Sequence, residues 1–269
     1  MVLETFDILG TAKLTAFLPL NVHLDPTDPR RIRPAILILP GGGYTMISNR
    51  ESEPIALQFL SQGITAFVLS YSVNSKFPRA LSEAAESMKF IRKKAGEWEL
   101  DPERIAVCGF SAGGHLAASL AVFWNHGFLN DLLGSQPSEI RPDGAILGYP
   151  VLSAAHPHSE SFRALLQDED TPERRKFLSI EEHIDDSTPP FFIWHTFDDS
   201  VVPLEGVLEV MKELKTHGVP FEAHVWAHGP HGLALGTPET RIADLANEYP
   251  CAGWPARAAD WIRTLPNPR

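Results

Sequence analysis

The chain has few cysteines and little positive charge, and both shortages narrow the functions open to it. Its 269 residues include 2 cysteines, Cys108 and Cys251, which are far apart in sequence and do not indicate a disulfide framework. A formal net charge of −11 leaves no basic face for neutralising phosphates, so we expect no nucleic-acid partner. Cys108 falls in an apolar run, and we expect it to be a small buried residue.

Patterns for export, membrane insertion and metal binding are also missing from the sequence. Residues 1–7 carry acids where a signal peptide would have lysine or arginine, and no apolar run reaches the roughly 18 residues of a membrane span. The 11 histidines form no H-E-x-x-H pattern, and the cysteines form no Cys-x-x-Cys pattern. We therefore expect a cytoplasmic protein with no membrane partner, no cofactor and no metal; a homo-oligomer is an open alternative to a monomer.

What is present is the balance of an ordinary globular enzyme, with 43% hydrophobic and 21% charged residues, and we expect residues 1–269 to form a single domain. Apolar runs alternate with helical periodicity, which predicts a mostly parallel sheet with helices on both faces. The expected strands are residues 35–39, 64–69, 104–108, 144–148, 191–196 and 221–227. The expected helices are residues 53–62, 81–97, 112–124, 204–217 and 255–263.

One segment interrupts this alternation. Residues 153–190 are polar, charged and dotted with histidines, including His156 and His158. Their position after a predicted strand indicates a small cap-like insertion over the carboxyl edge of the sheet, where a substrate would enter. A solvated helical excursion without substrate contact explains the same composition, so both interpretations stay open.

The most informative motif is the stretch GFSAGGH at residues 109–115, which lies between an expected strand and an expected helix. Gly109 and Gly113 allow a sharp turn that exposes the Ser111 hydroxyl above the sheet edge, as in a nucleophile elbow. A serine hydroxyl is a weak nucleophile unless a histidine base and an orienting carboxylate assist it. A plain connection or an anion-binding turn would also fit this pattern taken alone.

Candidates for both partners follow later strands. Asp198 and Asp199 come directly after the strand expected at 191–196, and His228 and His231 occupy a glycine-rich loop after the strand expected at 221–227. The chain order is then serine, aspartate, histidine, which is the order of α/β-hydrolases.

Together these motifs resemble the α/β-hydrolase esterases, in particular the acetylxylan-esterase-like and hormone-sensitive-lipase-like carboxylesterases, over residues 34–262. The resemblance also includes Pro40-Gly41-Gly42-Gly43-Tyr44 and a Val202-Pro203 pair. It implies an α/β-hydrolase fold, with two amino-terminal stretches, 5–9 and 13–18, as antiparallel edge strands. Many relatives have histidine where this chain has Pro40, and this departure favours the acetylxylan-esterase-like branch.

The resemblance also implies roles for individual residues. The family spacing makes Asp199 the catalytic acid and His231 the base, leaving Asp198 as a solvated loop or helix-entry carboxylate. Glycine lets backbone N–H groups approach an oxyanion without side-chain interference, and by resemblance Gly42, Gly43 and Ala112 supply those groups. His115 and His195 are expected to pack and hydrogen-bond as structural residues.

These residues together predict a serine carboxylic-ester hydrolase acting on a small-molecule ester with a short acyl group, with acetylated sugars or xylo-oligosaccharides as substrates by analogy. In this mechanism His231 removes the proton of Ser111 and Asp199 orients the imidazole. Alternatives are a general carboxylesterase or lipase-like enzyme without sugar preference, a peptidase of the same fold, and a binding module that has lost its chemistry. A dienelactone-type hydrolase would need cysteine at position 111.

Overall fold

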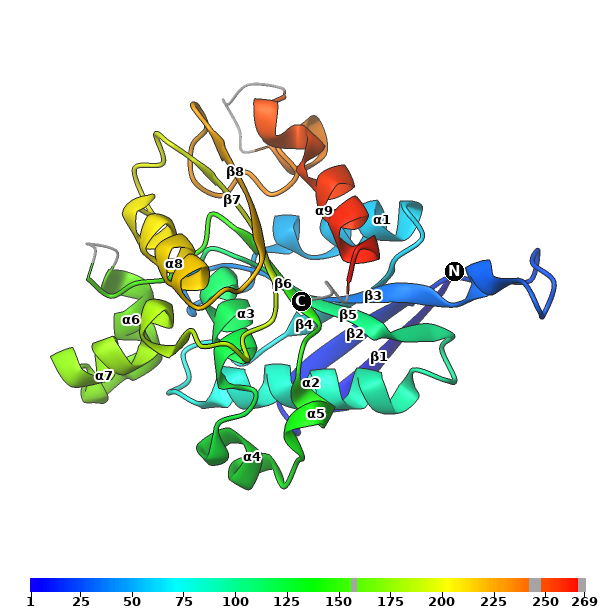
Figure 1. Cartoon of the computed structure of the whole chain (residues 1–269), viewed down its shortest axis with the longest axis horizontal. Coiled ribbons are helices and arrows are strands. Elements are labelled where there is room, and N and C mark those ends of the chain that lie inside the picture. Colours follow the sequence, from blue (N-terminus) through cyan, green and yellow to red (C-terminus); the bar gives the residue numbers. More distant parts are fainter. Residues whose placement is uncertain (156–158, 242–247, 266–269) are drawn as a thin grey trace.

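The strands form one twisted sheet across the molecule (Figure 1). The computed structural model describes residues 1–155, 159–241 and 248–265. The order of the strands is β1-β2-β4-β3-β5-β6-β7-β8, with β1, β2 and β4 joined by antiparallel pairing and the strands from β4 to β8 joined in parallel. The strands are β1 (Val2–Ile8), β2 (Ala12–Leu18), β3 (Arg33–Leu39), β4 (Thr65–Ser70), β5 (Leu100–Phe110), β6 (Gly144–Gly148), β7 (Phe191–Thr196) and β8 (Phe221–Trp226).

Alternation of apolar side chains along the central strands creates a core on each face of the sheet. In β3, Leu37 and Leu39 belong to one core and Ile36 and Ile38 to the other. Because successive side chains of a strand point to opposite faces, an uninterrupted apolar run is what a strand covered on both sides requires. The first core is covered by α2 (Arg79–Lys94), α3 (Ala112–Phe123) and α8 (Glu205–Thr216), and the second by α1 (Glu53–Ser61) and α9 (Trp254–Arg263). The predicted parallel sheet with helices on both faces is confirmed.

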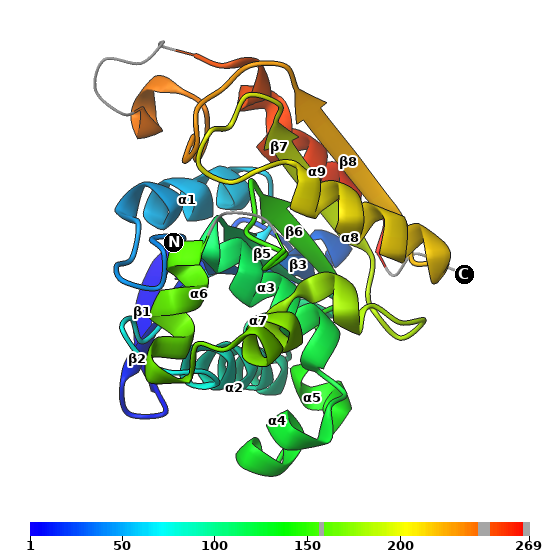
Figure 2. The ribbon, with the colours of Figure 1, turned by 90° about the vertical axis from the view of Figure 1, so that its left-hand side faces the viewer.

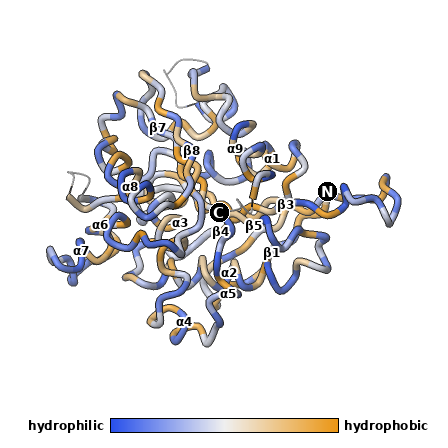
Figure 3. Tube along the Cα trace, in the orientation of Figure 1, coloured by the Kyte–Doolittle hydropathy of each residue, from blue (hydrophilic) through white to orange (hydrophobic). Residues whose placement is uncertain are grey.

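Helix α8 shows how the sequence directs a helix onto the sheet. Val207, Val210 and Leu214 recur at helical spacing and are buried, whereas Leu208 is half exposed. The hydrophilic residues fall on the outside, and the tube in Figure 3 changes between blue and orange along this helix. Within the described part of the chain, every helix is too short or too polar to cross a lipid bilayer.

Two short helices between α3 and β6 are absent from the sequence prediction. They are α4 (Gly127–Leu133) and α5 (Pro137–Ile140). At the start of helix α5 the Glu139 carboxylate accepts the N–H of Gln136 at 2.7 Å, and Pro137 stands in the first turn. This signal is visible in the sequence, but a four-residue helix shows too little periodicity to be detected by its apolar pattern.

The segment 153–190 folds as two helices, α6 (Ser159–Leu166) and α7 (Pro172–Leu178), with short 3₁₀ turns after each. Figures 1 and 2 both place α6 and α7 on the side of the sheet that carries α3 and α8. Phe162, Leu165 and Leu178 are buried in the core on that side. Residues 156–158, with His156 and His158, lie outside the described residues. A role for this segment as a cap over the substrate stays a prediction.

Candidate active site

Ser111 lies in a sharp turn between β5 and α3, in a backbone conformation that L-residues rarely adopt. Its φ is 52° and its ψ is −121°. A Cβ on Gly109 would lie 2.0 Å from the carbonyl oxygen of Gly113, and a Cβ on Gly113 would lie 2.1 Å from that of Leu39. Only glycine fits at either position, because both obstacles are backbone atoms. The G-x-S-x-G spacing therefore follows from the close packing of β3, β5 and α3, and it holds the serine in a strained conformation typical of functional sites.

The three side chains singled out in the sequence meet at the carboxyl ends of the strands. Nε2 of His231 is 2.8 Å from Oγ of Ser111, and Nδ1 of His231 is 2.7 Å from Oδ2 of Asp199. Because a carboxylate only accepts hydrogen bonds, Nδ1 carries the proton and Nε2 is the free base facing the serine. Ser111 and Asp199 precede His231 by 120 and 32 residues in the chain, so only the sheet topology brings the three side chains together.

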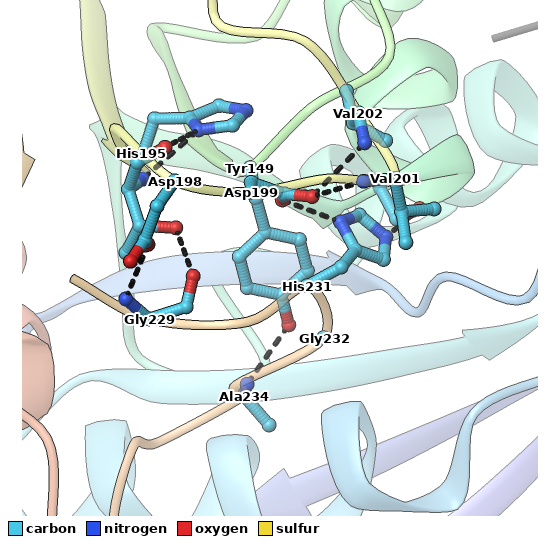
Figure 4. Close-up of polar contacts among 12 residues, drawn as sticks. Tyr149, His195, Asp198, Asp199, Val201, Val202, Gly229, His231, Gly232 and Ala234 are labelled. Atoms are coloured by element: carbon cyan, nitrogen blue, oxygen red, sulfur yellow. Dashed lines mark hydrogen bonds and ion pairs between the residues drawn. The ribbon is translucent and has the colours of Figure 1, made fainter.

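Asp199 is enclosed and held by the backbone that follows it (Figure 4). Its side chain is 1% exposed, and Oδ1 accepts hydrogen bonds from the N–H groups of Val201 and Val202 at 2.8 and 3.0 Å. Burial by itself raises the pKa of the Asp199 carboxyl, but the bonds from His231, Val202 and Val201 outweigh it and the pKa lies below its usual range. Asp199 is thus a fixed acceptor for the imidazole.

The loop that carries His231 is anchored on both sides of the imidazole. Asp198 accepts the N–H of Gly229 at 2.7 Å, and the Thr196 hydroxyl donates to the Gly229 carbonyl at 2.7 Å (Figure 4). After His231, the Arg50 guanidinium donates to the Gly232 carbonyl at 2.7 Å. Asp198 is an exposed carboxylate in the loop after β7, as expected, and it also binds the loop of the base. His228 contacts Asp198 at 3.1 Å but is 84% exposed.

The triglycine follows β3 and faces Ser111 across the site. The N–H of Gly41 is already bound by Oε2 of Glu51 at 2.7 Å. Gly42 and Gly43 have φ of 128° and 64°, in the region that favours glycine, and a Cβ on Gly42 would lie 2.1 Å from the Met46 carbonyl oxygen. Ala112 begins α3 directly after the serine, where helix N–H groups have no partner within the helix. Gly42, Gly43 and Ala112 therefore stay the oxyanion-hole candidates, and Gly41 is excluded by its bond.

Glu51 is the main residue of the site that sequence reasoning missed. Its side chain is buried, and besides Gly41 it accepts the hydroxyl of Tyr149 at 2.6 Å. That hydroxyl accepts the N–H of Ala234 at 2.9 Å, and the Tyr149 ring lies against the His231 ring at 5.0 Å between centroids (Figure 4). Glu51 thus connects the triglycine loop to the loop of the base. Only the tertiary contacts of this acid distinguish it from other glutamates near a helix start.

His115 and His195 are structural, as expected. His115 is 1% exposed, with Nδ1 2.7 Å from the Tyr44 hydroxyl and Nε2 2.8 Å from the Leu178 carbonyl oxygen. Burial lowers the pKa of His115 to about 4, so the ring is neutral and links the loop of Tyr44 to the end of α7. His195 is fully buried in β7, where burial lowers its pKa.

Two neighbouring pockets open beside the triglycine. The first has a volume of about 290 Å³ and is lined by Ser111 and His231 together with Gly42, Gly43, Met46 and Val201. The second, of about 490 Å³, shares Gly43 and extends toward α6. A larger pocket of about 610 Å³ lies between α1 and α9 and contains no member of the Ser111 group. Within the described residues, no three His, Cys, Asp or Glu side chains gather in a way that could hold a metal ion.

Comparison with known proteins shows the family to which this chain is similar over most of its length. Residues 20–214 match the BD-FAE family. The chain is 37% identical over 244 residues to endo-1,4-beta-xylanase B of Butyrivibrio fibrisolvens, a match that covers 87% of this chain and 37% of that protein. It is 26% identical to an acetylxylan esterase of Xylanibacter ruminicola, over 97% of this chain and 50% of that protein.

A solved structure also resembles this one: the acetyl ester-xyloside bifunctional hydrolase from Caldicellulosiruptor lactoaceticus has a TM-score of 0.78 and 37% identity, covering 94% of this chain and 88% of that one. The α/β-hydrolase fold is confirmed. The chain spans about half or less of the length of these two curated relatives.

Proposed function

The chain belongs to the BD-FAE family, and from this premise we propose that it is a serine carboxylic-ester hydrolase that removes short acyl groups, acetyl above all, from acetylated sugars. The hydrogen-bonded series Ser111–His231–Asp199 is the single observation that carries the proposal. A base with its proton on the far nitrogen, 2.8 Å from a strained serine hydroxyl, is the arrangement that acyl transfer needs.

The reaction proceeds in two steps. His231 takes the proton of Ser111 as its oxygen attacks the ester carbonyl, and Asp199 supports the imidazolium that forms. The oxyanion of the tetrahedral intermediate is stabilised by the N–H groups of Gly42, Gly43 and Ala112. His231 then gives its proton to the departing alcohol, and water repeats the sequence on the acyl-enzyme to release the acid.

Substituting the serine tests this chemistry. Ser111→Ala is expected to fold as the wild type does, because alanine and serine meet the same strain at this φ, and to lose about 10⁴-fold or more of kcat on p-nitrophenyl acetate. Labelling of the wild type by a fluorophosphonate probe, absent in Ser111→Ala, identifies the nucleophile independently of any substrate choice. An unchanged rate in the variant would remove Ser111 from the mechanism.

The acyl preference is argued from the small pocket at Ser111. Its volume of about 290 Å³ and the apolar side chains of Met46 and Val201 suit an acetyl or similarly short group rather than a long fatty chain. Support for sugar esters comes from relatives named acetylxylan esterase and acetyl ester-xyloside hydrolase. A hydrolysis panel of ethyl esters of increasing acyl length, together with acetylated xylosides, separates a sugar deacetylase from a general carboxylesterase.

A further inference from the structure

The second pocket beside the triglycine is lined mainly by polar and charged side chains. It is lined by Gly43 and by residues of polar or charged character: Thr45, Asn74, Glu160, Arg163 and Gln167, with Ala164 between them. Its volume of about 490 Å³ is larger than that at Ser111, and Gly43 is common to both. Because the two pockets meet at Gly43, an ester bound at Ser111 could place its acyl group in the first pocket and extend its alcohol into the second.

We propose that this second pocket binds the alcohol part of the ester, and that its ligand is a neutral, hydroxyl-rich group such as a pyranoside. The inference rests on the proposed function. To that function the inference adds a set of residues that select the alcohol, and Ser111, Asp199 and His231 are not among them.

The charges of the pocket favour a neutral ligand. Glu160 and Arg163 form an ion pair at 3.1 Å on one face of α6, so their charges cancel. The other polar lining residues are uncharged. A pair of this kind presents guanidinium donors beside carboxylate acceptors, which matches two adjacent hydroxyl groups of a sugar, each able to donate and accept. A phosphorylated or carboxylated alcohol would meet no net positive charge here.

The amide side chains of the pocket favour hydroxyl donors. Nδ2 of Asn74 donates to the Thr45 carbonyl at 3.2 Å, and Nε2 of Gln167 donates to the Asn74 carbonyl at 3.0 Å. One N–H of each amide is engaged by the backbone, so each amide keeps its oxygen acceptor and a second N–H to meet a ligand. Oxygens of this kind accept hydrogen bonds from sugar hydroxyls and gain nothing from a hydrocarbon chain.

The wall of the pocket is also held in place before any ligand arrives. The N–H of Phe77 donates to the Leu165 carbonyl at 3.0 Å, and Lys76 pairs with Asp168, so the loop of Asn74 is joined to α6 and the turn after it. Asn74 has a φ of 52°, which asparagine tolerates, and Gln167 has a φ of 55°, a strained conformation for glutamine. Strain that surrounding contacts maintain is typical of ligand clamps, and a preformed site loses less ordering entropy on binding.

The test compares two acetate esters that differ only in the alcohol. For each protein, kcat/KM is measured on an acetylated methyl xyloside and on ethyl acetate, and the ratio of the two values is compared with that of the wild type. Arg163→Ala is expected to lower this ratio about 10-fold, mainly through KM for the xyloside, because a charged hydrogen bond to the alcohol is lost. Asn74→Gly, which keeps the left-handed backbone, is expected to lower it in the same direction.

Arg174→Ala is the matched control, since Arg174 also forms an exposed ion pair, with Glu169 at 3.1 Å, but stands on α7 outside the pocket. Its ratio is expected to equal that of the wild type. Equal ratios in Arg163→Ala, Asn74→Gly and Arg174→Ala would overturn the inference while leaving the esterase proposal intact. A change of acyl-length preference in Arg163→Ala, with the ratio constant, would instead assign the pocket to the acyl group. Absence of hydrolysis of both esters by the wild type would refute the proposed function and the inference with it.

Discussion

Replacement of Glu51 by alanine is the perturbation whose effect the structure defines most closely. Glu51 is 3% exposed, and its carboxylate accepts hydrogen bonds from the Gly41 N–H and the Tyr149 hydroxyl. In Glu51→Ala both donors stay buried without an acceptor, and each such group costs about 1–3 kcal/mol. We therefore expect the free energy of unfolding to fall by about 2–6 kcal/mol, a large part of the roughly 5–15 kcal/mol of an ordinary domain.

The same change is expected to affect catalysis through geometry. Gly41 precedes the two glycines that face Ser111, and Tyr149 holds Ala234 in the loop of His231. An oxyanion exists only after attack, so displaced N–H donors lower kcat more than they raise KM, by up to about 10²-fold. Glu51→Gln keeps one acceptor and the volume of the side chain, and we expect it to recover part of both losses.

Chemical denaturation monitored by tryptophan fluorescence measures the stability, and p-nitrophenyl acetate measures kcat and KM. Glu53→Ala is the control, because Glu53 is an exposed acid two residues away, and its unfolding free energy is expected to change by about 0.5 kcal/mol or less. Wild-type stability and wild-type kcat in Glu51→Ala would refute the reasoning. If Glu51→Ala does not fold, Glu51→Gln supplies the kcat measurement on its own.

Three further results are expected. Asp199→Asn should lower kcat on p-nitrophenyl acetate by about 10⁴-fold with little change in fold, since the amide no longer selects the tautomer with the proton on Nδ1 of His231; a loss under tenfold would contradict this. His115 has a native pKa of about 4 against an ordinary 6.5, so the unfolded chain gains a proton first and stability should fall as the pH drops from about 6.5 to 4. When the free energy of unfolding is measured by denaturation at several pH values, His115→Gln should reduce its fall between about pH 6.5 and 4. The control His217→Gln replaces an exposed histidine and should show the same fall as the wild type. Gly113→Ala should destabilise by about 3 kcal/mol or more, because its Cβ meets backbone at 2.1 and 2.4 Å, whereas Gly96→Ala, with open space around it, should stay within about 1 kcal/mol in the same assay.

Much of the fold is recoverable from local patterns because both sheet faces are covered. An apolar run such as residues 191–194 fits a central strand covered on both faces, and the structure has it in Phe191–Thr196. The periodicity of residues 204–217 predicts a helix that the structure has at Glu205–Thr216. The antiparallel β1 and β2 followed from family resemblance, not from periodicity. Helices α4 and α5 were not predicted from the sequence, because helices of seven and four residues have too few turns to show a repeating apolar face.

The sequence by itself determined the residue types that acyl transfer requires and their order along the chain: a serine between two glycines, then an aspartate, then a histidine. These are facts of residue type and of spacing from strand ends, which the sequence shows directly. Only the tertiary structure decided that Glu51 joins the two loops of the site, that Asp198 binds the loop of the base, and that Gly41 is already engaged. Those contacts link residues 10 to 98 positions apart in the sequence. No local sequence pattern specifies which buried acceptor meets which donor in the folded chain.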